Sequence, residues 1–80
     1  MGATVNKARR KEIDSVIEAL EKAKEQLEVI RDDEQDYFDN MPESFQYAEK
    51  GEAAEEAISN LDYAIDQIDE VIENAASAKG

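Results

Sequence analysis

The chain has 80 residues, with 21 acidic and 9 basic residues, a net charge of −12, and no histidine, cysteine or tryptophan. This composition excludes the usual zinc sites, thiol nucleophiles and imidazole bases. Hydrophobic residues make up 41% of the chain and aromatic residues 6%, which predicts a single small domain with an aliphatic core. No apolar run is long enough to span a membrane, and residues 1–6 lack the apolar stretch of a signal peptide. We therefore expect a soluble cytoplasmic protein.

The first predicted element is a helix over residues 6–38. Its apolar residues recur at alternating spacings of three and four, which places them in one narrow stripe, as in the seam of a coiled coil. The stripe comprises Ile13, Val16, Leu20, Ala23, Leu27 and Ile30.

A reversal of the chain is predicted over residues 39–50. Pro42 cannot continue a helix and disfavours the helical conformation of Met41. Pro42 can instead open a short helical turn, with Glu43 near the positive end of its dipole. We expect Gly51 to act as a hinge or cap before the next helix.

Four aromatic residues cluster near this reversal: Tyr37, Phe38, Phe45 and Tyr47. We expect them to cap the end of a helical bundle. The alternative is an exposed anchor patch for a partner, because aromatic side chains bind well at a low entropy cost.

A second helix is predicted over residues 51–77. Its apolar stripe comprises Ala54, Ile58, Leu61, Ile65, Ile68, Ile72 and Ala75. When the chain folds back, the two stripes align in six pairs whose residue numbers add up to 88, such as Leu20 with Ile68. The sequence therefore predicts an all-α protein consisting of an antiparallel two-helix coiled-coil hairpin.

The two flanks of this seam are predicted to differ. One flank contains Ile17, Lys24 and Arg31 on the first helix and Ala64 and Val71 on the second, and it is apolar or small apart from the long stems of Lys24 and Arg31. The other flank is acidic and contains Asp62 and Asp69 of the second helix. A hairpin this short buries little apolar area, so we expect Ile17, Ala64 and Val71 to mediate dimerisation into a four-helix bundle. The alternative is that they widen the seam of a monomer.

The charged clusters offer little chemistry. The carboxylates of residues 32–39 lack the glycine and terminal glutamate of a calcium-binding EF-hand, and no phosphate-binding loop or catalytic pairing is present. We expect no enzyme activity, no metal and no cofactor. The basic cluster at residues 7–11 is expected to pair with carboxylates within or between chains rather than with nucleic acid.

The acidity of the second half of the chain is its sharpest feature. Residues 32–73 contain fifteen acidic residues and one basic residue, Lys50. Like charges four residues apart destabilise a helix by about 0.2–0.5 kcal/mol per pair, a cost that solubility alone does not explain. Four residues rise about 6 Å along a helix, comparable with the spacing of phosphates along a DNA strand. The candidate partner-binding residues are Glu55, Asp62, Asp66, Asp69, Glu70 and Glu73.

Residues 34–44 read Glu-Gln-Asp-Tyr-Phe-Asp-Asn-Met-Pro-Glu-Ser and are followed by Ala-Glu-Glu-Ala-Ile at 54–58 and Asn-Leu at 60–61. This pattern resembles a family of short acidic helical proteins encoded by bacteriophages and mobile elements of Gram-positive bacteria, over residues 7–74. The resemblance implies a bacterial host cell and a role in binding a host protein.

Together these features predict a non-enzymatic acidic protein, a homodimer, that acts as a phage-type inhibitor. It would occupy a basic nucleic-acid-binding surface of a host protein by DNA mimicry, without itself contacting nucleic acid or membrane. The alternative is a structural coiled-coil scaffold or oligomerisation module whose acidity serves only solubility.

Overall fold

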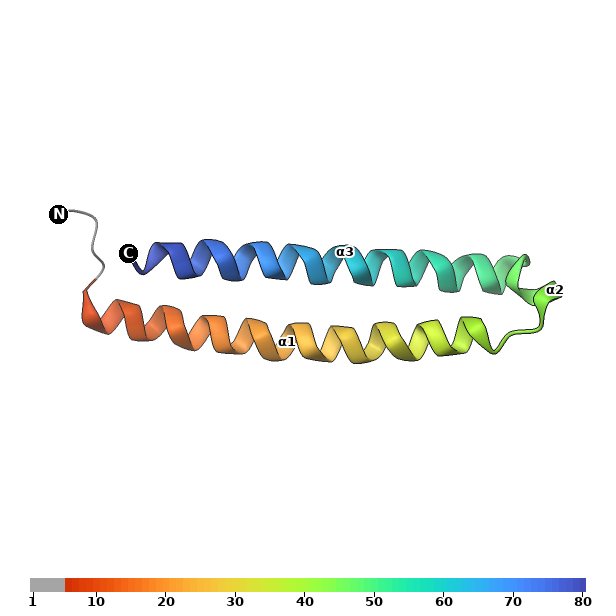
Figure 1. Cartoon of the computed structure of the whole chain (residues 1–80), viewed down its shortest axis with the longest axis horizontal. Helices are drawn as coiled ribbons and strands as arrows, with labels where there is room; N and C mark the ends of the chain where they lie inside the picture. Colours follow the sequence, from red (N-terminus) through yellow and green to blue (C-terminus); the bar gives the residue numbers. More distant parts are fainter. Residues whose placement is uncertain (1–5) are drawn as a thin grey trace.

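The computed structural model describes residues 6–80, and within this range it consists of helices without strands. Two long helices, α1 (Lys7–Asp39) and α3 (Glu49–Ala78), are joined through the short helix α2 (Glu43–Gln46) (Figure 1). The predicted all-α class is confirmed. None of the three helices is long and apolar enough to cross a membrane.

The ends of α1 are defined by two asparagines. The Asn6 side chain accepts a hydrogen bond from the backbone N–H of Arg9 at 2.9 Å, and so satisfies one of the free donors of the first turn. At the other end, Asn40 donates from its backbone N–H and its side-chain amide to the carbonyl oxygen of Asp36. Pro42 follows two residues later and prevents the helix from continuing.

The connection between the long helices is compact. Pro42 is the N-cap of α2, and the Gln46 side chain donates a hydrogen bond to the carbonyl oxygen of Phe38, which ties α2 to the last turn of α1. The prediction that Gly51 is a hinge or cap is wrong. Gly51 lies buried inside the first turn of α3, where an added Cβ would come within 2.1 Å of the Gln46 carbonyl oxygen.

The helix α3 runs back alongside α1 (Figure 1). A salt bridge of 2.6 Å between Asp14 and Lys79, the C-cap residue of α3, joins this end of α3 to the beginning of α1. The Cα atoms extend over 62 × 17 × 12 Å, so the molecule is a thin rod. Among the described residues, only Ala54 (2% exposed), Ile65 (9% exposed) and Gly51 count as buried.

The predicted stripe of α3 faces α1, because every one of its members is buried or half-buried. On α1 the prediction is wrong at two positions. Val16 and Ile30 are 54% and 52% exposed, whereas Lys24 and Arg31 are half-buried. The salt bridges of Lys24 and Arg31 to α3 turn this side of α1 towards its neighbour, while their aliphatic stems cover apolar surface.

Candidate binding surface on α3

All six carboxylates singled out from the sequence lie on α3, and five of them belong to exposed residues, with Asp62 half-buried. Asp66, Glu70 and Glu73 follow at spacings of four and three residues, so they share one face of the helix. Glu55 lies about three turns earlier, in the half of α3 nearer to the reversal.

Two of the six carboxylates are neutralised by α1. Asp69 accepts from the Lys24 ammonium at 2.7 Å, and Asp62 accepts from the Nε of Arg31 at 2.7 Å. Arg31 also contacts its neighbour Asp32 at 3.1 Å. The hydrogen bond to Asp69 raises the pKa of Lys24, and the hydrogen bonds to Asp62 and Asp32 raise the pKa of Arg31. Both cations are therefore firmly held in their charged forms.

These salt bridges correct the predicted assignment of the flanks, which placed Asp62 and Asp69 on the side opposite Lys24 and Arg31. The physical reason is geometric. In an antiparallel helix pair, the residues that come directly after a seam residue in one helix lie on the same flank as the residues that come directly after a seam residue in the other. Lys24 and Asp69 each follow a seam residue directly, and so they share a flank.

The remaining four carboxylates, Glu55, Asp66, Glu70 and Glu73, make no salt bridge with any residue in the range 6–80. They are exposed along α3 and carry part of its net negative charge. We call these four residues the α3 acidic face.

Two shallow hollows lie along the flank of the salt bridges. One, of about 270 Å³, is lined by Gln35, Phe38, Glu55, Ile58, Ser59 and Asp62. The other, of about 400 Å³, is lined by Glu28, Arg31, Asp32, Asp62 and Ile65. The carboxylates of the first hollow come from α3, and those of the second come from both long helices. This side of the rod is therefore suited to cationic groups rather than to anions.

The residues predicted for self-association do not form one patch. Ile17 is half-buried and lies in the same heptad position as Lys24 and Arg31, on the flank of the salt bridges. Ala64 and Val71 directly precede seam residues and belong to the other flank, where Ala64 is half-buried and Val71 is 48% exposed.

The aromatic residues near the reversal do not cap it as predicted, except for Phe38, which is half-buried. Tyr37, Phe45 and Tyr47 are 52%, 55% and 78% exposed. The corner is instead held by the hydrogen bond of the Gln46 amide and by the close approach of Gly51 to Gln46.

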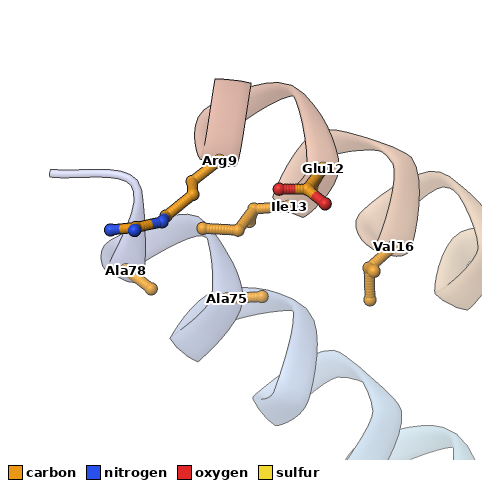
Figure 2. Close-up of a pocket in the computed structure, with 6 residues that line it drawn as sticks. All are labelled: Arg9, Glu12, Ile13, Val16, Ala75 and Ala78. Carbon is orange, nitrogen blue, oxygen red and sulfur yellow. The ribbon is translucent and has the colours of Figure 1, made fainter. Parts of the chain in front are cut away.

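A hollow that could not be predicted from the sequence lies at the end of the rod opposite α2, which we call the open end. It has a volume of about 540 Å³ and is lined by Arg9, Glu12, Ile13, Val16, Ala75 and Ala78 (Figure 2). The small side chains of Ala75 and Ala78 leave the space that a larger residue would fill. One feature of the sequence indicated this space, because the predicted register pairs Ile13 with the small side chain of Ala75.

The basic cluster of Lys7, Arg9, Arg10 and Lys11 is exposed, and its members form no salt bridge with another residue in the described range. No three carboxylates of residues 6–80 come together in a way that suits a metal ion.

No protein-family model, curated protein or solved structure matches this chain.

Proposed function

We propose that the chain is a non-enzymatic binding protein that occupies a basic nucleic-acid-binding surface of a host protein, with the α3 acidic face in place of DNA phosphates. The observation that carries this proposal is that Asp66, Glu70 and Glu73 are exposed on one helix face and have no cationic partner among residues 6–80. Their spacing of about 4.5 to 6 Å along the helix suits a row of basic side chains that binds phosphates.

Electrostatics support a partner of positive charge. Carboxylates four residues apart, such as Asp66 and Glu70, repel each other and cost the helix about 0.2–0.5 kcal/mol per pair. A row of lysine or arginine side chains relieves this repulsion on binding. With a net charge of −12, the protein also steers such a partner over long distances, and this attraction falls with ionic strength.

In this proposal the working unit is an antiparallel hairpin that pairs with a second copy to form a four-helix bundle. The thin core supports this, because two helices that bury so few residues supply little free energy of folding. The resemblance of residues 34–61 to short acidic phage proteins supports the cytoplasm of a bacterial host as the setting.

The test compares two variants with the same net charge. Asp66→Asn/Glu70→Gln/Glu73→Gln removes three charges from the α3 acidic face, and Glu18→Gln/Glu21→Gln/Glu25→Gln removes three exposed charges from α1. Each protein is immobilised and incubated with lysate of a Gram-positive bacterium, and the captured protein is challenged with labelled duplex DNA at two salt concentrations.

We expect the parent and the α1 variant to capture the same protein, duplex DNA to displace it competitively, and the α3 variant to lose capture. Equal capture by the α3 variant, or simultaneous binding of DNA and this protein by the captured partner, would overturn the proposal. That result would favour the scaffold, for which the acidity serves only solubility.

A further inference from the structure

A second heptad stripe on α1 runs along the edge of its contact with α3. Val16, Ala23, Ile30 and Tyr37 recur every seven residues, and Ala19, Gln26 and Asp33 lie between them at spacings of three and four. Val16, Ile30 and Tyr37 are 54%, 52% and 52% exposed, and Ala23 is half-buried. We call Val16, Ala23, Ile30 and Tyr37 the α1 outer stripe. Its periodicity is that of a helix–helix interface.

The two ends of α1 carry opposite charges. Its first turns contain Lys7, Arg9, Arg10 and Lys11, and its last turns contain Asp32, Asp33, Asp36 and Asp39. Salt bridges within residues 6–80 neutralise none of the four bases, and of the four acids they involve only Asp32. A helix with such ends is complementary to a second copy of itself in the opposite orientation.

The hollow at the open end supplies a third observation. It begins at Arg9, passes Ile13 and ends at Val16, and so it borders the basic end of the outer stripe (Figure 2). Tyr37 stands at the acidic end of the same stripe, and its ring is exposed although it is one of the largest side chains of α1.

We infer that the α1 outer stripe is the interface with a second copy of this chain, with the two α1 helices antiparallel about a two-fold axis at Ala23. This rests on the dimer of the proposed function and names its interface. Residues at equal distances from the axis then meet across the interface: Val16 with Ile30, Arg9 with Tyr37, and Arg10 with Asp36.

This arrangement accounts for the three observations together. The small side chain of Ala23 lets the helices approach closely at the axis. The ring of Tyr37 enters the hollow of the other copy, beside Ile13 and beneath the guanidinium of Arg9, where apolar contact and a cation–π interaction both stabilise it. Each basic end meets an acidic end, so the contact is favourable despite the net negative charge of both copies.

The register is tested with single cysteines in a chain that has none of its own. Ala23→Cys lies on the axis, and we expect it to form a disulfide-linked dimer under mild oxidation without loss of helix. Position 16 of one copy lies about 21 Å along the helix axis from position 16 of the other copy, and the same holds for position 30. Val16→Cys alone and Ile30→Cys alone should therefore stay reduced. Mixed together, they should cross-link to each other. Glu25→Cys, on the opposite face of α1, is the matched control that stays reduced.

The energetics are tested with Tyr37→Ala, Arg10→Glu and the double variant Arg10→Glu/Asp36→Arg, with the dimer dissociation constant measured by analytical ultracentrifugation. We expect Tyr37→Ala and Arg10→Glu each to weaken the dimer about tenfold or more, and the double variant to recover most of the loss. A parent that stays monomeric at high micromolar concentration overturns both this interface and the proposed dimer. A dimer without the Ala23 and Val16–Ile30 cross-links overturns this interface alone.

Discussion

Among single residues, Gly51 is under the tightest steric constraint. It is buried in the first turn of α3, and an added Cβ would come within 2.1 Å of the carbonyl oxygen and 2.5 Å of the carbonyl carbon of Gln46. Its backbone is helical, and among the described residues only Gly80 has a positive φ. Glycine is therefore needed here for the close approach of two backbones, and not for an unusual backbone conformation.

A methyl group at position 51 should therefore destabilise the fold. In an open helix, Gly→Ala stabilises by up to about 1 kcal/mol. Gly51→Ala should instead lower the free energy of unfolding by about 1–3 kcal/mol, because the α2–α3 corner must move apart to admit the methyl group. Urea unfolding followed by circular dichroism measures the change. Asn60→Ala, at an exposed position of α3, is the control and should be neutral or stabilising. A stabilised Gly51→Ala protein would contradict the tight corner.

The side of α1 that faces α3 could not be predicted from the sequence, whereas the side of α3 that faces α1 could. The stripe of α3 could be predicted, because only one of its large aliphatic residues, Ile72, has a neighbour of similar size, Val71. On α1 the apolar residues Val16 and Ile17 stand side by side, and periodicity alone could not decide which of them faces α3. The salt bridges of Lys24 and Arg31 to α3 turn their own side of α1, which includes Ile17, towards α3. All six candidate carboxylates lie on α3, but these same salt bridges neutralise Asp62 and Asp69.

At the scale of elements, α1 and α3 are held together by aliphatic contacts along the seam and by salt bridges on one flank. The residue numbers of the three inter-helix salt bridges, which join 14 with 79, 24 with 69 and 31 with 62, all add up to 93. A constant sum means that the contacts repeat in one register along the rod. The charged flank thus fixes the rotation of α1 about its own axis.

The salt bridge of Lys24 should therefore matter for stability in a salt-dependent way. Lys24→Gln removes the cation, leaves Asp69 without its partner and should lower the melting temperature, more at 20 mM than at about 500 mM salt because screening weakens the contact in the parent. Lys22→Gln, an exposed residue of α1 outside the inter-helix salt bridges, is the control and should change little.

The pH dependence follows from the same contact. The hydrogen bond to Asp69 raises the pKa of Lys24. Its stabilisation is thus complete below the unfolded value of about 10.4 and is lost as the pH rises through the raised folded pKa. The gap between the melting temperatures of parent and Lys24→Gln should therefore persist at pH 9 and narrow above pH 10.4 or so. A gap that is already closed at pH 9, or that is insensitive to salt, would contradict this role for the pair.

At the scale of the whole molecule, the all-α class and the long helix pair could be predicted because both stripes repeat over many turns. The hollow at the open end and the exposed outer stripe could not, since both depend on how α1 is rotated against α3. The outcome is a rod that buries only three of its described residues and carries a net charge of −12. Such a rod has little free energy of folding of its own and gains most from a neighbour that covers Val16 and Ile30.

Folding of the rod should depend on this neighbour. If folding and association are coupled, thermal unfolding becomes dependent on concentration by mass action. Raising the protein concentration about a hundredfold, from about 5 to about 500 µM, should raise the melting temperature by about 5–10 °C. Circular dichroism at 222 nm in cells of different path length measures this shift. The oxidised Ala23→Cys dimer is the matched control, because a covalent dimer unfolds in a unimolecular step, and its melting temperature should not change with concentration. A parent with the same melting temperature over the whole range folds without a second copy, and the exposed outer stripe would then face solvent or another protein.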